Sequence, residues 1–150
     1  MSSVGGVDLY GASYRNFASA LYAEIRREAF GEDIGQTGWL TAEEQDLFLA
    51  WLGLSPAARL LDVACGSGGP TLRIAEKTGC RVVGLDLHAE GIAGAKAGAQ
   101  ERGLENCAEF HGGDAAAPLP FGDRSFDALT CIDAIICPTG RACSGNGAAS

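Results

Sequence analysis

The chain has 150 residues with a net charge of −8, and 47% of them are hydrophobic, which suits one domain with a sizeable core. The acidic balance argues against a sequence-independent grip on nucleic acid or on an anionic membrane surface, because phosphate contacts need Lys and Arg. No apolar run is long enough to span a bilayer and no signal-peptide pattern opens the sequence, so we expect a cytoplasmic protein without membrane attachment.

Two amphipathic helices are predicted ahead of any strand. Between residues 10 and 30, large apolar residues recur at steps of three and four, which predicts one helix; they are Tyr10, Tyr14, Phe17, Leu21 and Ile25, with Tyr22 alongside. After a glycine-punctuated loop, Thr41 and Glu44 form a capping box at the start of a second helix. The apolar face predicted for this second helix consists of Leu47, Phe48, Trp51 and Leu52. We therefore expect an N-terminal helical cap over residues 1–56.

From residue 57 onward, strand patterns alternate with helix patterns. Strands are predicted at 59–64, 81–87, 108–114 and 126–135, and helices at 68–79 and 89–103. Strongly apolar strands without in/out alternation are typical of a parallel sheet covered on both faces. The sequence therefore predicts an α/β fold, in which a Rossmann-like parallel sheet over residues 57–136 has helices on both faces and is incomplete after its fourth strand.

The cysteines do not have the spacing of a metal site. No two of them form a C-x-x-C pair, and His88 and His111 fall near no such pair. We therefore predict no metal ion, and interpret most cysteines as small buried side chains of a protein in a reducing compartment.

A glycine-rich turn from Cys65 to Gly69 carries the clearest functional signal. Its glycines let backbone N–H groups approach a ligand, and the following helix N-terminus adds a favourable dipole. Asp86 ends the second strand, where an acid accepts hydrogen bonds from a ribose diol. A dinucleotide fingerprint needs a third glycine where this chain has Thr71, and Asp62 in the first strand would repel a pyrophosphate. A carboxylate at that position suits a cationic or amino-bearing ligand.

Three successive stretches, LDVACGSGGPTL, VVGLDL and GGDAAAPLPFGDRSFDALTCIDAI, resemble the motifs of class I S-adenosylmethionine-dependent methyltransferases. The N-terminal helices and FGEDIGQTGWLTAEEQDLFLAWLGL more narrowly resemble the small-molecule branch that includes sarcosine/dimethylglycine-type N-methyltransferases. The resemblance implies S-adenosyl-L-methionine as the cofactor and a small-molecule methyl acceptor. Transfer from a sulfonium is a direct displacement that depends on positioning, so no catalytic residue is assigned.

The resemblance also implies cofactor-binding positions, which are Asp62, Ala64, Gly66, Gly68, Asp86, Leu87, Asp114, Ala115 and Cys131. The first-strand acid and the glycine turn would hold the methionine part, and Ala64 stands where the family usually has its first glycine. Asp86 would hold the ribose, and Leu87 would lie against the adenine. Asp114 and Ala115 would contact the adenine amino group, and Cys131 would line the pocket near the sulfonium.

Each of these roles has a plainer alternative. Asp62 and Asp114 are also residue types that cap local turns, and Cys131 is equally suited to a core. Tyr14, Tyr22 and Trp39 either line a lid over the substrate or belong to the core, and Asp133 is a further candidate for a polar substrate contact.

The tail over residues 137–150 is rich in Gly and Ser and poor in large apolar residues. In the family the sheet continues with a helix and three further strands, so we expect an interruption here, by a frameshift, the alternative being a natural disordered end. Three functions stay open: a truncated and impaired methyltransferase, an NAD(P)-binding Rossmann oxidoreductase fragment, and a non-enzymatic binding module. The acceptor and the oligomeric state cannot be inferred.

Overall fold

The computed structural model describes residues 9–132. The helices are α1 (Leu9–Asn16), α2 (Ala20–Phe30), α3 (Ala42–Leu52), α4 (Gly69–Thr78) and α5 (Ala89–Glu101). The strands are β1 (Arg59–Val63), β2 (Arg81–Asp86), β3 (Ala108–Gly112) and β4 (Ala128–Thr130). The expectations for the 137–150 tail, for Asp133 and for the end of the fourth strand lie outside the described residues.

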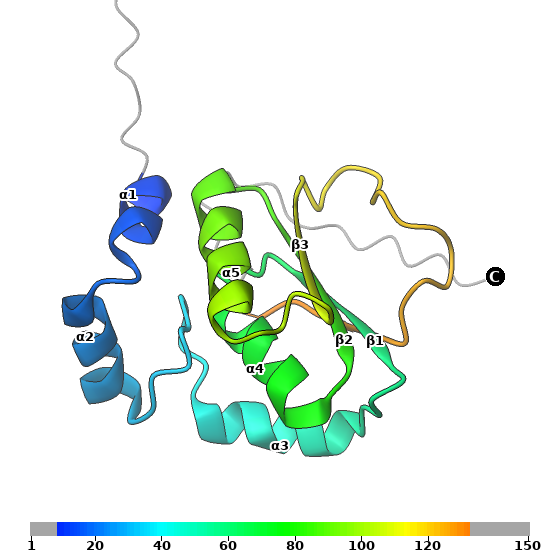
Figure 1. Cartoon of the computed structure of the whole chain (residues 1–150), viewed down its shortest axis with the longest axis horizontal. Coiled ribbons are helices and arrows are strands. Elements are labelled where there is room, and N and C mark those ends of the chain that lie inside the picture. Colours follow the sequence, from blue (N-terminus) through cyan, green and yellow to red (C-terminus); the bar gives the residue numbers. More distant parts are fainter. Residues whose placement is uncertain (1–8, 133–150) are drawn as a thin grey trace, which may run out of the picture.

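The four strands form one parallel sheet in the order β3-β2-β1-β4. Strands and helices alternate from β1 to β3, so each of the first two strands is followed by a helix that returns the chain for a parallel neighbour (Figure 1). The Rossmann-like parallel sheet predicted from the sequence is therefore confirmed.

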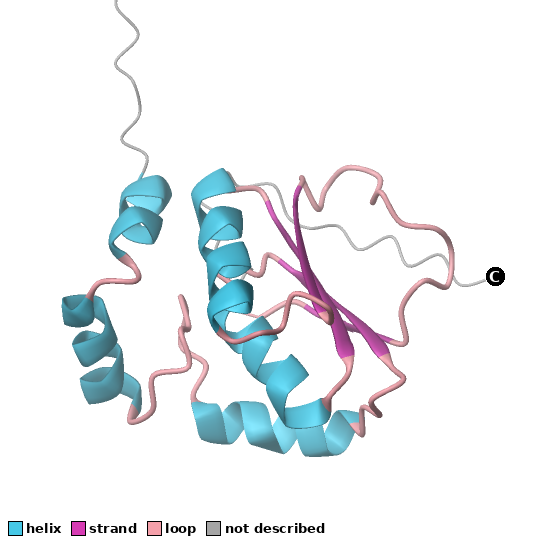
Figure 2. Cartoon of the chain, viewed as in Figure 1, coloured by secondary structure: helices cyan, strands magenta, loops and turns pink. Residues whose placement is uncertain are grey.

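One face of the sheet carries the main core. Helices α4 and α5 lie over this face (Figure 2). Strand side chains of this face pack against them, and Leu49 of α3 belongs to the same cluster. The most deeply buried members are Leu60, Leu72, Ile74, Cys80, Val82 and Ala95, each at most 1% exposed.

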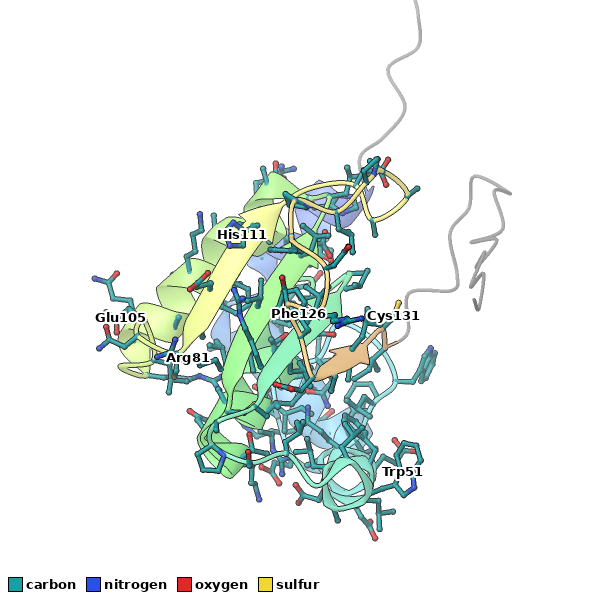
Figure 3. All side chains as sticks on the ribbon, turned by 90° about the vertical axis from the view of Figure 1, so that its right-hand side faces the viewer. Trp51, Arg81, Glu105, His111, Phe126 and Cys131 are labelled. Carbon is teal, nitrogen blue, oxygen red and sulfur yellow. The ribbon has the colours of Figure 1, made fainter. Side chains whose placement is uncertain are left out.

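The opposite face lacks a helical layer within residues 9–132. Leu61, Val83 and Leu85 are buried there beneath Phe121 and Phe126, which come from the loop between β3 and β4. Figure 3 looks onto this face, with Phe126 over the strands. The predicted helices on both faces are thus present on one face only in the described part of the chain.

The first predicted helix is two helices, which corrects the single helix expected over residues 10–30. Helix α1 ends at Asn16 and α2 begins at Ala20. Ser19 caps α2 by accepting a hydrogen bond from the Tyr22 N–H. Arg26 reaches back from α2 and donates to the carbonyl oxygen of Phe17 at 3.1 Å, while its guanidinium lies 4.1 Å from the Phe17 ring centroid. Arg26 is buried in place of the apolar stripe, and Leu21 and Ile25 are exposed.

The capping box of the next helix is confirmed, because Thr41 and Glu44 bond each other's backbone N–H groups at the start of α3. The predicted apolar face is wrong in part. Leu47 and Trp51 are 67% and 85% exposed, and Leu49 and Gln45 are buried instead. Packing against α4, which the periodicity of α3 alone does not reveal, selects the buried side.

Candidate functional site

Two buried carboxylates lie at the carboxyl ends of the central strands. The register pairs Asp62 of β1 with Gly84 of β2, so Asp62 and Asp86 point to the same face of the sheet. Their side chains are only 4% and 6% exposed. Burial raises the pKa of Asp62 to about 6 against two hydrogen bonds that lower it, and the charge of Asp86 adds to the rise. The site therefore concentrates negative charge in a desolvated place.

The Asp62 carboxylate is held by two hydroxyl groups. Thr71 in the first turn of α4 donates to one oxygen at 2.5 Å, and Thr130 of β4 donates to the other at 2.9 Å. Thr71, which replaces the third glycine of a dinucleotide fingerprint, is fully buried. The sequence reasoning noted this replacement and missed its function as a hydrogen-bond donor to Asp62.

Asp86 organises the glycine turn from the neighbouring strand. One of its oxygens accepts the Gly66 N–H at 2.8 Å, and the other accepts the His88 N–H at 2.8 Å. The His88 ring nitrogen Nδ1 lies 3.2 Å from the same oxygen. A carboxylate offers about four acceptor positions, so these bonds leave Asp86 with capacity for further donors.

The turn between β1 and α4 has the backbone that its glycines suggest. Gly66 and Gly68 have φ angles of +58° and +76°. A Cβ on Gly68 would lie 2.7 Å from Cβ of Ala95 and 2.9 Å from the Phe110 ring, so only glycine lets α5 and β3 approach so closely.

Ala64 also adopts a left-handed conformation, with φ of +59°. This is the position where the resemblance led us to expect a glycine, and the backbone still has the shape that a glycine prefers. A non-glycine residue there is strained by contact between its Cβ and the backbone.

The other predicted residues follow the carboxyl ends of β2, β3 and β4, at the same edge of the sheet, and are exposed to solvent. Leu87, directly after Asp86, is 67% exposed. Asp114 and Ala115 are exposed in the loop after β3, where Asp114 accepts the Ala116 N–H at 2.8 Å, so the alternative of a local cap applies to it. The Gly113 N–H donates to the Asp86 carbonyl at 2.9 Å, which ties this loop to the end of β2. Cys131 follows β4 and is exposed.

Two residues of the N-terminal region cover the glycine turn. Tyr14 was a candidate lid residue from the sequence, whereas Thr37 was not expected at the site. A Cβ on Gly66 would lie 3.1 Å from both the Tyr14 hydroxyl and the Thr37 hydroxyl, so these groups lie directly over the turn. The Tyr14 ring also contacts His88, with centroids 5.7 Å apart. Of the three candidate lid residues, Tyr14 is thus beside the site, whereas Trp39 is 76% exposed and contacts Phe30.

Two arginines are buried among the described residues, and both form ion pairs with acids other than Asp62 and Asp86. Arg26 binds Asp33, and Arg73 binds Asp46 and the side-chain oxygen of Gln45, which fastens α3 to α4. Among the described residues no cluster of His, Cys, Asp and Glu has the arrangement of a metal site. Nor does any described helix combine the length and hydrophobicity needed to cross a membrane.

Comparison with known proteins identifies the family. Residues 60–143 match the family model described as a methyltransferase domain, which is 84 of the 150 residues. A sterol 24-C-methyltransferase of Gibberella zeae is 32% identical over 130 residues, covering 82% of this chain and 33% of the relative. A 2-phytyl-1,4-naphtoquinone methyltransferase of Synechocystis is 44% identical over 82 residues, covering 53% and 34%. The chain spans about a third of the length of these curated relatives.

Solved structures show the same fold. A methyltransferase of Thiobacillus denitrificans in complex with S-adenosyl-L-homocysteine has a TM-score of 0.60 and 28% identity, covering 73% of this chain and 43% of that one. A [4+2]-cyclase named SpnF has a TM-score of 0.55 and 37% identity, covering 58% and 32%. A sarcosine dimethylglycine methyltransferase structure from Galdieria sulphuraria, at 22% identity and a TM-score of 0.55 over 59% and 33%, shows likeness in fold alone.

Proposed function

The chain belongs to the class I S-adenosylmethionine-dependent methyltransferases, and from this premise we propose that the carboxyl ends of β1 and β2 bind S-adenosyl-L-methionine for methyl transfer to a small-molecule acceptor. The observation that carries the proposal is the pair of desolvated carboxylates, Asp62 and Asp86, on either side of a glycine turn. The cofactor brings two positive centres, an ammonium and a sulfonium, and a negative field of this kind favours both.

The chemistry of the donor set fits the cofactor. Asp86 has free acceptor capacity for ribose hydroxyls, and the exposed Leu87 beside it offers an apolar surface for a base. In the turn itself, the buried Ser67 hydroxyl has no hydrogen-bond partner among the described residues, so a polar ligand group would satisfy it. When bound, S-adenosylmethionine supplies an activated methyl group, and the chain orients and desolvates it.

The remaining assignments follow from the family. We propose that Asp114 and Ala115 contact the adenine amino group and that Cys131 lines the methyl-transfer end of the site. Support comes from their common location, because all three residues follow strands whose carboxyl ends lie at one edge of the sheet. Burial raises the pKa of the thiol at Cys65 inside the turn, so this residue serves as a packed side chain and not as a nucleophile.

For the acceptor we propose an apolar isoprenoid compound. The support is that two of the relatives are named for sterol and phytyl-naphthoquinone substrates. The net charge of −8 further favours a small molecule over nucleic acid. We also propose a cytoplasmic location, which the thiols of Cys65, Cys80 and Cys107 support, because none of these three forms a disulfide.

The cofactor proposal is tested by calorimetric titration with S-adenosylhomocysteine and, separately, with NAD. We expect saturable binding of the former only, and Asp86→Asn should weaken it by about tenfold or more, since a hydrogen bond to a charged group contributes about 1.5 to 3 kcal/mol. Asp123→Asn, in the exposed loop between β3 and β4, is the matched control and should bind as the parent does. Binding of NAD in place of S-adenosylhomocysteine would favour the oxidoreductase alternative.

Methyl transfer needs its own assay, because the fold is also used by a cyclase. We would incubate the protein with methyl-labelled cofactor and a sterol or naphthoquinone and measure label in the organic phase. Cofactor binding without transfer to any isoprenoid acceptor would support the proposed cofactor site and reject the proposed acceptor class.

A further inference from the structure

The buried guanidinium of Arg26 ties together two segments of the N-terminal region. Its Nε and Nη2 atoms donate to the two carboxylate oxygens of Asp33 at 2.6 Å and 3.2 Å, and its Nη1 atom donates to the carbonyl oxygen of Phe17 at 3.1 Å. Phe17 directly follows α1, and Asp33 lies in the loop between α2 and α3. One side chain therefore fixes the end of α1 and this loop relative to each other.

The loop from Asp33 to Thr37 is also seated on the start of α4. The Gly35 N–H donates to the carboxylate of Asp33 at 2.9 Å, which holds the loop to the residue that binds the arginine. A Cβ on Gly69, the first residue of α4, would clash with the carbonyl oxygens of Ile34 and Gly35. The loop backbone therefore lies directly against the backbone of α4, as only a glycine at this position allows.

Each of the two tied segments presents one hydroxyl group to the glycine turn. Tyr14 lies in α1 three residues before Phe17, and Thr37 lies in the loop four residues after Asp33. Both hydroxyl oxygens are 3.1 Å from the position that a Cβ on Gly66 would take. The two hydroxyls thus lie at the turn to which the family resemblance assigns the amino-acid half of the cofactor.

The amino-acid half of S-adenosylmethionine carries an ammonium and a carboxylate. The buried acids at the ends of β1 and β2 suit the ammonium, but they repel the carboxylate. The carboxylate therefore needs hydrogen-bond donors from another side of the turn, and hydroxyl groups supply such donors. The hydroxyls of Tyr14 and Thr37 have both the location and the chemistry for this contact.

We propose that Arg26 is a positioning residue for the cofactor site. Through Phe17 and Asp33 it fixes the two segments of the N-terminal region. The hydroxyls of Tyr14 and Thr37 then lie over the glycine turn and donate to the carboxylate of the cofactor. The inference rests on the proposed function and deepens it, because it gives the site a second wall from the N-terminal region.

The contact at Thr37 is tested with two ligands that differ only in the carboxylate. S-Adenosyl-3-thiopropylamine is S-adenosylhomocysteine without that group. Thr37→Val should lower the affinity for S-adenosylhomocysteine by about three- to tenfold, as for one lost hydrogen bond, and leave the affinity for the amine unchanged. Thr37 is exposed, so the substitution leaves the fold in place, and Thr37→Ser should bind as the parent does. Equal losses for both ligands would overturn the carboxylate contact.

Arg26→Lys tests the positioning, since lysine keeps the charge but not the planar fork that binds Asp33 and Phe17 together. It should weaken S-adenosylhomocysteine by about tenfold and the amine by less than about twofold. Arg73→Lys is the matched control, because this second buried arginine fastens α3 to α4 and should bind both ligands as the parent does. Equal weakening in the two lysine variants would reflect a general loss of packing and would reject the inference.

A double variant shows whether Arg26 acts through Thr37. If it does, Arg26→Lys combined with Thr37→Val should bind S-adenosylhomocysteine no more weakly than Arg26→Lys alone, because the hydroxyl is already displaced. Losses that multiply would mean that the two residues act independently, which contradicts a positioning role.

Amide hydrogen exchange gives a readout that does not depend on the cofactor. Arg26→Lys should speed exchange of the Gly35 N–H and leave β2, at the centre of the sheet, unchanged. A parent protein that bound neither ligand would refute the proposed function and the inference together. A parent that bound S-adenosylhomocysteine, while Thr37→Val and Arg26→Lys bound it equally well, would refute the inference alone.

Discussion

The two faces of the sheet are built from the same kinds of strand residue but are covered differently. On one face, Val82 and Phe110 are 1% and 3% exposed beneath α4 and α5. On the other face, Leu61 and Val83 rely on Phe121 and Phe126 of a loop, and Leu129 on β4 is 60% exposed. A hollow of about 580 Å³, lined by Leu61, Leu119 and residues 121–129, lies on this second face.

The difference shows that apolar strand residues are necessary for a core but do not by themselves complete one. A buried face also needs a second layer whose side chains fill the space at high density. The helix-covered face has that layer and carries the two buried carboxylates, which in turn need hydrogen-bond donors from that layer and from neighbouring strands. The loop-covered face has a thinner layer over the same strands.

The largest expected effect compares one aromatic side chain on each face. Phe110→Ala should lower the free energy of unfolding by about 3 to 5 kcal/mol, because the ring is buried and fills the space left by Gly68 and Gly84. Phe126→Ala should cost only about 1 to 2 kcal/mol, since this ring is half-buried. Urea unfolding of both variants measures the difference, and equal losses would contradict the contrast between the faces.

The pH dependence of stability tests the carboxylates on the helix-covered face. The folded pKa of Asp62 is about 6, above its ordinary value of 3.8, so the folded state retains a proton that the unfolded state has released. The stability should therefore fall by about 2 to 3 kcal/mol as the pH rises from about 4 to about 6.5. Asp33 and Asp46 have lowered pKa values, so their contributions are lost only at more acidic pH.

Asp62→Asn is the control for this pH profile, because an amide does not titrate. Thermal unfolding of the variant should show a flatter dependence on pH over the same window. A variant with the same slope as the parent would assign the titration to another group.

Ala64→Gly tests the turn that leads from β1 to the helix-covered face. Relief of the left-handed strain should raise the free energy of unfolding by about 0.5 to 1 kcal/mol, after the larger chain entropy of glycine is subtracted. Ala50→Gly, at an exposed site within α3, should have the opposite sign and cost about 1 kcal/mol. Chemical denaturation of both variants measures the signs.

The smallest expected effect concerns the loop-covered face. Leu129→Ala should change stability by no more than about 0.5 kcal/mol, because the side chain is largely exposed. A loss well above 1 kcal/mol would mean that other atoms cover this face in solution, and the contrast between the two faces would weaken.

Much of the fold was predictable from local pattern. The strand and helix over residues 59–79, including Pro70 at the helix start and the left-handed Gly79 at its end, agree with the structure, because local geometry dictates these choices. The single N-terminal helix was wrong because Arg26 and Ser19 stabilise a break that apolar spacing does not reveal. The division of the chain into a cap, a sheet domain and a tail stays a prediction.

In the candidate site, too, local pattern predicted some residues and not those that come from distant segments. Asp62, Gly66 and Asp86 were chosen from their places around a strand–turn–helix unit, and the structure does bring them together. Tyr14 and Thr37, which lie over Gly66, come from segments whose distance from the turn cannot be read from spacing.

The sequence by itself determined the order of strands and helices, the glycine turn and the acids at the strand ends, since these depend on neighbours a few residues apart. The tertiary structure alone decided which face of the sheet is covered, which side of α3 is buried, and that Asp62 bonds Thr71 and Thr130. Those outcomes depend on residues distant in the chain, because burial and hydrogen bonding are set by whatever packs against a side chain.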